Sequence, residues 1–230
     1  MLDRPYGDQG RLWIVTLDLG TRTLSWLATH GHPIRYRYVD RPWPIEMYQN
    51  VYATSPGSAE MPSAGRPFTP EAITALVAKG VGVAPIVLHT GVASLEAHEL
   101  PYPERMIVPE PTAEWVNGAH RTGHRVIAVG TTVVRSLEAA ATGGAVRPFS
   151  GETSIFIKPG HCFRGVDAML TNFHLPKSTL LMLCAAFVGR ESLLAAYAHA
   201  VNARYRFFSY GDAMFLTPLP HVLARAADRA

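Results

Sequence analysis

Cysteine is scarce in this sequence, with Cys162 and Cys184 the only two among 230 residues. Each stands beside an apolar residue, so we predict that both are buried, reduced thiols. No CxxC pair is present, which excludes the usual zinc-binding and disulfide-exchange motifs. We therefore expect no metal site.

Long apolar runs and blocks of like charge are also missing. The longest apolar run, residues 180–188, is far shorter than the roughly 20 residues of a membrane-spanning helix. The first residues lack the basic and apolar regions of a signal peptide. These absences predict a cytoplasmic protein with no membrane partner. The net charge of +3 is compatible with nucleic-acid binding but does not argue for it.

The sequence does contain enough apolar residues, 48%, to bury a core. Runs rich in β-branched and aromatic residues predict strands at residues 12–15, 24–27, 34–39, 85–88, 125–129, 154–157 and 166–170. Capping residues and 3.6-residue periodicity predict helices at residues 70–79, 112–120, 131–141, 178–188 and 191–203, with a helical turn near 45–49. The first of these helices has Thr69 as its N-cap and Pro70 at its first position. This alternation predicts an α/β layer domain, preceded by a piece of a small β-domain.

The first candidate site is a turn between a strand and a helix at residues 126–135. Its strand has an unbroken apolar core, which predicts burial on both faces. Gly130 allows a sharp turn, and Thr131 or Thr132 can cap the helix, whose free amides attract an anion. Arg135, one turn further on, can bind a carboxylate or phosphate with its guanidinium. An ordinary capped turn with a surface arginine is the alternative.

The second candidate site follows the strand at residues 166–170. Asn172 and His174 stand close together after it, and His side chains titrate near neutral pH. Lys177 and the helix cap Ser178 come next. These residues can bind a substrate or transfer a proton. A structural histidine at the start of a helix is the alternative.

The third candidate site is an aromatic segment, residues 205–212. Tyr210 and its aromatic neighbours can stack on a purine, while Arg206 and Asp212 can hydrogen-bond to it. A turn that buries Phe207 and Phe208 is the alternative. His89 and Gly91 mark another strand end with a weaker signal.

Four segments in this order resemble the motifs of one family, the S-adenosylmethionine:tRNA ribosyltransferase-isomerases of queuosine biosynthesis. They read GTTVVR at 130–135, GETSIFI at 151–157, TNFHLP with STLLML at 171–183, and YRFFSYGDAMF at 205–215. The third and fourth strings are long and specific, and the resemblance covers about residues 48–216.

The resemblance implies an α/β (α+β) fold, a mixed-sheet catalytic domain with helices packed on it and a small inserted β-barrel domain. On this basis residues 1–40 are expected to be a remnant of the barrel. Residues 41–218 would be the C-terminal part of the large catalytic domain, and residues 219–230 a C-terminal tail. Since family members are typically well over 300 residues, we expect the chain to begin inside the barrel, without the first segment of the catalytic domain.

The resemblance also implies a reaction. Such enzymes transfer and isomerise the ribosyl part of S-adenosylmethionine onto 7-aminomethyl-7-deazaguanine (preQ1) at the wobble position of a tRNA. Adenine and methionine leave, and epoxyqueuosine is formed. S-adenosylmethionine is consumed as a co-substrate, so no cofactor is expected. The expected partners are S-adenosylmethionine and tRNA carrying preQ1, with a monomer favoured.

Roles for individual residues follow from the demands of this reaction. Thr131 and Arg135 are expected to bind the methionine carboxylate, and Tyr210 to hold a nucleobase. Proton transfer is expected of catalytic residues His174, Asp212 and Glu152. The remaining substrate-binding candidates on these motifs are Thr132, Asn172, Ser178, Arg206, His89 and Gly91. Arg35, Arg37 and Arg206 are candidates for a local tRNA-binding patch.

Three segments depart from the family pattern. Residues 62–68 read PSAGRPF where the family has PTAGLHF, and residues 89–95 read HTGVASL where Gly-Thr-Phe normally follows the glycine. Residues 99–104 read ELPYPE in place of His-x-Met-His-Ser-Glu and retain only the glutamate. The lost histidines, together with the expected absence of the first segment of the catalytic domain, leave two alternatives to the family reaction. One is a diverged enzyme that uses another acceptor, and the other is a non-catalytic fragment that binds S-adenosylmethionine or tRNA.

Overall fold

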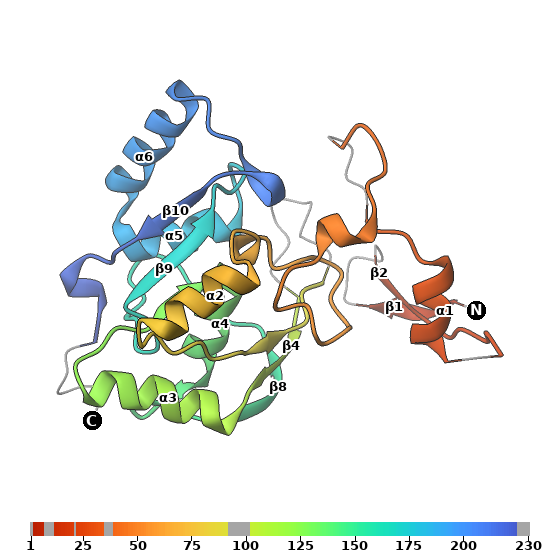
Figure 1. Ribbon diagram of the computed structural model, residues 1–230, viewed down its shortest axis with the longest axis horizontal. Coiled ribbons are helices and arrows are strands. Elements are labelled where there is room, and N and C mark those ends of the chain that lie inside the picture. Colours follow the sequence, from red (N-terminus) through yellow and green to blue (C-terminus); the bar gives the residue numbers. More distant parts are fainter. Residues whose placement is uncertain (1, 7–11, 21, 35–38, 92–101, 225–230) are drawn as a thin grey trace. The chain divides into compact units, whose positions relative to one another are not determined.

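The computed structural model describes residues 2–6, 12–20, 22–34, 39–91 and 102–224 (Figure 1). The chain divides into two compact units, Met1–Tyr48 and Gln49–Ala230. Arg35, Arg37 and most of the strand predicted at residues 34–39 lie outside the described residues.

The first unit contains a two-stranded antiparallel sheet and one helix. Strand β1 (Leu2–Tyr6) pairs with β2 (Leu12–Val15), which confirms the strand predicted at 12–15. The strand predicted at residues 24–27 is wrong, because helix α1 (Thr23–His30) occupies this segment. A short apolar run does not distinguish strand from helix. The helix is favoured locally by Trp26 and His30, whose rings stack 4.7 Å apart one turn from each other.

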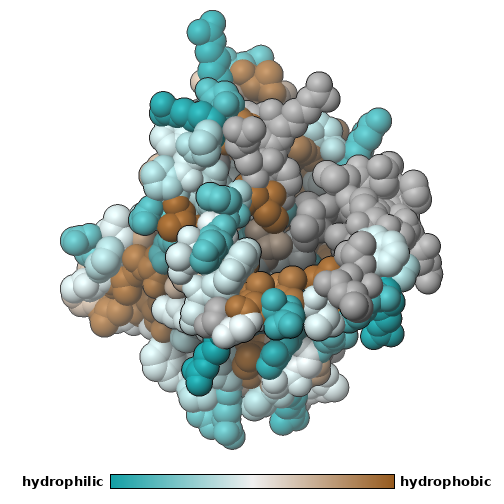
Figure 2. All heavy atoms as spheres, turned by 90° about the vertical axis from the view of Figure 1, so that its right-hand side faces the viewer, coloured by the Kyte–Doolittle hydropathy of each residue, from teal (hydrophilic) through white to brown (hydrophobic). Residues whose placement is uncertain are grey.

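No described residue of the first unit is buried. Trp13, Leu17 and Leu24 are each about half exposed. The unit ends in the 3₁₀ turn η1 (Ile45–Tyr48), where a helical turn was predicted. Figure 2 shows the surface on one side of the molecule, where apolar side chains form several patches separated by polar ones.

The second unit contains two three-stranded sheets. One has the order β10-β9-β5, with β5 (Ile127–Val129) parallel to β9 (Ala168–Asn172) and β10 (Ala213–Leu216) antiparallel to β9. The other is antiparallel, with the order β3-β4-β8: Val87–Leu88, Glu104–Val108 and Phe149–Thr153. Strands β6 (Ala141–Thr142) and β7 (Ala145–Val146) form a hairpin around two glycines with positive φ.

The five predicted helices are all present in this unit. They are α2 (Pro70–Ala78), α3 (Glu110–Arg121), α4 (Thr131–Ala140), α5 (Thr179–Val188) and α6 (Arg190–Asn202). The oxygen Oγ1 of Thr69 accepts a hydrogen bond from the Ala72 amide at 3.2 Å, which confirms the predicted cap of α2. Helix α4 contacts β5 and β9 of one sheet and all three strands of the other, so it joins the two sheets (Figure 1). The α/β fold class predicted from the sequence is confirmed.

A buried carboxylate fixes the C-terminal half of α4. The carboxylate of Glu138 accepts hydrogen bonds from the amides of Arg164 and Gly165, the latter at 2.7 Å. The imidazole of His161 lies 3.1 Å from the same carboxylate. Because these bonds compensate the burial of its charge, Glu138 can anchor the helix whose N-terminus reaches the candidate site.

The hydrophobic core lies between α4, the two sheets and helix α5. Its largest fully buried side chains include Phe163 and Phe187, whose rings meet edge to face at 4.7 Å. Cys184 is buried as predicted, whereas Cys162 is only half-buried; both are free thiols. Near the C-terminus, Leu223 forms a β-bridge with Phe163.

Three local predictions in the second unit are wrong. Residues 154–157 are not a strand, since β8 ends at Thr153, whose hydroxyl oxygen accepts a hydrogen bond from the Ile155 amide and turns the chain. Strand β5 is buried on one face only, and Ile127 is 44% exposed. No threonine caps α4, because Gly130 occupies the N-cap position with φ 100° and the threonines follow it within the helix.

Among the described residues, no single helix has the length and apolar character needed to cross a membrane. Helices α5 and α6 meet that requirement only when taken together, and they are bent by 115° relative to each other.

Candidate functional site at the carboxyl ends of the parallel strands

The parallel strands β5 and β9 bring the first two candidate sites to one edge of their sheet. Gly130 follows β5, and its amide donates a hydrogen bond to the carbonyl oxygen of Leu170 in β9 at 2.8 Å. The third candidate site joins them, because Ala213, the first residue of β10, pairs with Asn172 at the end of β9. Ligands of open α/β sheets bind beyond the carboxyl ends of the strands. This edge is therefore the candidate site.

Asn172 holds three segments together at this edge. Its Oδ1 accepts a hydrogen bond from the Ser63 hydroxyl at 3.0 Å. Its Nδ2 donates to the carbonyl oxygens of Gly211 at 3.4 Å and Asp212 at 3.3 Å. The side chain is only 5% exposed. All the polar atoms of this amide thus have protein partners, and Asn172 shapes the site by fixing the 3₁₀ turn at Ser63–Gly65 (η2) beside the loop before β10.

His174 is held at both its backbone and its ring. The Tyr197 hydroxyl accepts a hydrogen bond from the His174 amide at 2.7 Å and donates one to the His174 carbonyl at 3.2 Å. Ring nitrogen Nε2 lies 2.9 Å from Oγ1 of Thr171. Burial lowers the pKa of His174 from 6.5 to about 4. The imidazole is therefore neutral at pH 7, in contrast to the near-neutral titration expected from the sequence.

Asp212 and Arg206 close the aromatic loop on itself. The amide of Arg206 donates to Oδ2 of Asp212 at 2.8 Å, and the Asp212 amide donates to the Arg206 carbonyl at 2.8 Å. A side chain at Gly211 would clash, since its Cβ would lie 2.3 Å from that carbonyl oxygen. The Arg206 side chain is 78% exposed, and its Nη2 lies 3.8 Å from Oδ1 of Asp212, so their ion pair is weak.

The N-terminus of α4 presents Thr131 and Thr132 at the edge, with Thr131 buried. Arg135 forms a salt bridge with Glu104 of β4, and both side chains are 14% exposed. Its Nε is buried and has no hydrogen-bond partner among the described residues. The guanidinium predicted to bind a substrate carboxylate is thus paired with a carboxylate of the protein.

Glu152 lies on the other sheet and faces away from this pair. In the register of β4 with β8, Glu104 is opposite Thr153 and Arg105 is opposite Glu152. Successive residues of a strand point to opposite faces, so Glu152 lies on the face opposite to Glu104. Glu152 is exposed, and the described contacts do not bring it to His174.

The structure places the remaining predicted residues as follows. Ser178 caps α5, with its Oγ accepting from the Leu181 amide at 3.2 Å. His89 lies at the end of β3, where its amide donates to the Arg105 carbonyl, and Gly91 is exposed. Tyr210 belongs to the 3₁₀ turn Phe208–Tyr210 (η3), but its side chain lies outside the described part of the structure.

Sequence reasoning missed three residues of this site, namely Ser63, Thr171 and Tyr197. The segment containing Ser63 was singled out only for its departure from the family pattern. Thr171 begins the motif that contains His174, a position that could have identified it. Tyr197 lies within α6, 23 residues from its partner His174. The sequence around Tyr197 therefore does not indicate this contact.

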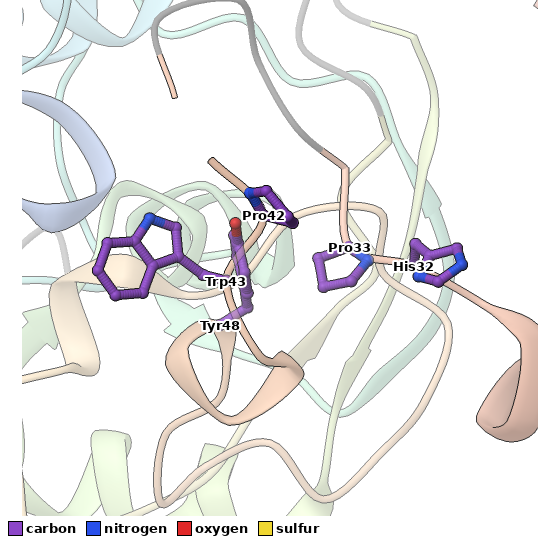
Figure 3. Close-up of a pocket in the computed structure, with 5 residues that line it drawn as sticks. All are labelled: His32, Pro33, Pro42, Trp43 and Tyr48. Carbon is purple, nitrogen blue, oxygen red and sulfur yellow. The ribbon is translucent and has the colours of Figure 1, made fainter. Parts of the chain in front are cut away.

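Two surface hollows lie elsewhere in the described structure. One, of about 210 Å³, lies in the first unit. It is lined by His32, Pro33, Pro42, Trp43 and Tyr48 (Figure 3). Another, of about 470 Å³ in the second unit, is lined by Val51, Tyr52, Pro70, Ile73, Thr74, Val83 and Pro85. Neither lining combines a carboxylate with an imidazole. Among the described residues, no three His, Cys, Asp or Glu side chains cluster as a metal site would require.

The fold and these contacts define an α/β protein whose candidate site combines a neutral imidazole and a carboxylate at the carboxyl edge of a sheet. Its sequence matches the family of queuosine biosynthesis proteins over residues 5–216, and the chain belongs to this family.

Individual relatives are similar over most of the chain. It is 47% identical over 224 residues to the S-adenosylmethionine:tRNA ribosyltransferase-isomerase of Xylella fastidiosa strain M23, which covers 92% of this chain and 64% of that protein. The protein of the same name from Geobacter sulfurreducens is 44% identical over 225 residues, 93% of this chain and 65% of the relative. The chain thus spans less than two thirds of the length of these relatives.

A solved structure agrees with this assignment. The crystal structure of the S-adenosylmethionine tRNA ribosyltransferase from Thermotoga maritima matches with a TM-score of 0.58 and 48% identity, over 66% of this chain and 50% of that one.

Proposed function

We propose that the protein transfers and isomerises the ribosyl group of S-adenosylmethionine onto preQ1 at the wobble position of a tRNA. The products are epoxyqueuosine in the tRNA, adenine and methionine. The observation that carries this proposal is the meeting of three family motifs at one sheet edge, where His174 and Asp212 lie on loops tied together by Asn172. The names of the similar proteins, which state this donor and tRNA, support it.

Removal of the sugar proton and stabilisation of the leaving adenine are assigned to different side chains. The reaction requires loss of a proton from the sugar carbon next to the sulfonium, and a carboxylate such as Asp212 can accept it. It also requires stabilisation of the departing adenine. His174, neutral because burial lowers its pKa to about 4, can donate a hydrogen bond to an adenine nitrogen. Glu152 is left out of these steps because it faces away from the Glu104–Arg135 pair.

Substrate groups are assigned to the surrounding backbone and side chains. The free amides at the start of α4, next to Thr131 and Thr132, are proposed to bind the methionine carboxylate. Arg135 supports that helix start through Glu104. Ser178 and Asn172 position the loop that carries His174. Residues 41–218 carry the proposed activity, with tRNA and S-adenosylmethionine as its partners.

The test is to incubate the protein with S-adenosylmethionine and tRNA carrying preQ1. The expected result is adenine release together with epoxyqueuosine in the digested tRNA, and neither with tRNA lacking preQ1. Adenine release with free preQ1 but not with the tRNA would instead indicate a different acceptor. Measurable S-adenosylmethionine binding without turnover would contradict the proposal and favour a binding fragment.

Variants locate the reaction at the sheet edge. His174→Ala and Asp212→Ala are expected to abolish turnover while the variants still fold, as judged by circular dichroism. His124→Ala is the matched control, since His124 is exposed at the end of α3 and bonds only to Thr122 among the described side chains. Full activity in both His174→Ala and Asp212→Ala would refute the site.

A further inference from the structure

Among the described residues, one acceptor is placed to receive the proton of the buried Thr171 hydroxyl. Thr171 is 1% exposed within β9, and its backbone pairs with Met214 of β10. Oγ1 lies 2.9 Å from Nε2 of His174, and this is its only hydrogen-bond contact with a described residue. A buried hydroxyl whose proton has no acceptor is costly, so the proton of Thr171 points to Nε2.

This direction of the hydrogen bond determines where the imidazole proton lies. In a neutral imidazole one ring nitrogen donates and the other accepts. If Nε2 accepts from Thr171, the ring proton must be on Nδ1. Nδ1 has no hydrogen bond with the described residues, and it is not among their buried unpaired polar atoms. It is therefore accessible to a ligand as a donor.

Tyr197 fixes the backbone of His174 and thereby keeps the imidazole within reach of Thr171. Its hydroxyl holds both the amide and the carbonyl of His174, at 2.7 Å and 3.2 Å. The ring of Tyr197 is itself packed edge to face on Phe173 at 5.3 Å. With the backbone fixed, only side-chain rotation remains, and the bond from Thr171 sets that rotation.

We propose that Thr171 is a positioning residue that holds His174 in the tautomer protonated at Nδ1 and directs this N–H to the ligand. The inference rests on the proposed function only for the identity of the ligand atom, the departing adenine nitrogen. The tautomer itself is a property of the protein alone, so it can be measured without turnover.

The experiment is ¹⁵N NMR of the histidine rings at pH 7 in the full chain, with His174→Gln used to assign its signals. The parent protein is expected to show a protonated Nδ1 and an unprotonated Nε2 at His174. Thr171→Val removes the hydroxyl at nearly constant volume, and is expected to shift the population toward protonated Nε2. Thr171→Ser restores the hydroxyl and is expected to restore the parent pattern.

Thr112→Val is the matched control for loss of a buried threonine hydroxyl. Thr112 is 4% exposed, and its hydroxyl donates to the Pro85 carbonyl at 2.7 Å, away from His174. This variant is expected to leave the His174 signals unchanged. A parent spectrum with the proton on Nε2, or an unchanged tautomer in a folded Thr171→Val, would overturn the inference.

Turnover distinguishes this inference from the proposed function. Thr171→Val is expected to lower kcat about tenfold with little change in KM for S-adenosylmethionine, because an orienting hydrogen bond is lost. Thr171→Ser is expected to recover most of the activity. If Thr171→Val shifts the tautomer but leaves kcat unchanged, the inference about the tautomer holds, and His174 does not take part in the proposed reaction.

Discussion

At the scale of single residues, Asn172 and His174 lie two positions apart but differ in how many of their side-chain polar atoms are hydrogen-bonded to described residues. The amide of Asn172 bonds to Ser63 on one side and to the loop before β10 on the other. The imidazole of His174 has one nitrogen bonded to Thr171 and one without a described partner. Asn172 is thus suited to holding the site together, and His174 to acting on a ligand.

Replacement of Asn172 by Asp tests this structural role. The carboxylate can still accept from Ser63 but cannot donate to the carbonyl oxygens of Gly211 and Asp212. The expected loss in the free energy of unfolding is about 1–3 kcal/mol, measured by urea denaturation. Asn202→Asp, at the exposed end of α6, is the control and is expected to cost less than about 1 kcal/mol. Equal losses in both variants would contradict the role of Asn172.

The lowered pKa of His174 predicts how stability depends on pH. In the folded protein this histidine titrates at about pH 4, whereas in the unfolded chain it titrates near 6.5. Between these values the unfolded chain binds a proton that the folded protein does not, so stability falls as the pH is lowered from about 6.5 to about 4. The full effect is at most about 3 kcal/mol, and it is complete below the folded pKa.

The measurement is the difference in unfolding free energy between the parent and His174→Gln from pH 4 to pH 7. The parent is expected to lose its stability advantage as the pH falls through this range, while other groups cancel in the difference. A difference that stays constant with pH would mean that burial does not lower the pKa of His174.

The sequence predicted Asn172 and His174 as candidates for the site, but not what they contact. Asn172 and His174 follow a predicted strand, and that local pattern was sufficient to locate them. Their partners Ser63 and Tyr197 are 109 and 23 residues away, so only the folded chain reveals them. The same holds for Arg135 of α4, because nothing in the sequence around it indicates that it pairs with Glu104 of β4.

At the scale of elements, helices were predicted better than strands because their signals are local. Thr69 and Ser178 each cap the helix that follows, within three residues. Strand identity depends on pairing with distant segments. The apolar run at residues 24–27 folds as a helix, and the run at 154–157 follows a strand that has already ended at Thr153.

The cap of α5 gives a prediction at this scale. Ser178→Ala is expected to cost about 1 kcal/mol of unfolding free energy, because the Leu181 amide loses its acceptor. Thr69→Ala is the matched control, since it removes an equivalent cap from α2 at a similar cost. Only Ser178→Ala is expected to weaken S-adenosylmethionine binding, measured by calorimetry, because Ser178 also bonds to the carbonyl of Leu175 in the loop after His174. If the two variants bind S-adenosylmethionine equally well, the loop after His174 does not contribute to binding of the ligand.

At the scale of the whole molecule, charge is nearly balanced, with 21 basic and 18 acidic residues. A net charge of +3 spread over 230 residues produces only a weak long-range field. Any affinity for tRNA must therefore come from a few local contacts with phosphates.

Arg206 is the described member of the predicted tRNA-binding patch, and its environment favours this role. Its side chain is 78% exposed, and its ion pair with Asp212 is long, so little binding energy is lost when a phosphate replaces the carboxylate. The loop that carries it is fixed by the bond from its own amide to Asp212. The charge is thus held next to the proposed proton acceptor while its tip remains free to contact a tRNA backbone.

Salt dependence tests this contact. Each phosphate contact releases counterions, so the logarithm of the binding constant falls linearly with the logarithm of the salt concentration. Arg206→Ala is expected to weaken tRNA binding and to reduce the magnitude of that slope by about 1. Lys79→Ala, at the exposed end of α2, is expected to leave the slope unchanged. If both variants keep the parent slope, the phosphate contacts lie elsewhere, and Arg206 serves only to close its loop on Asp212.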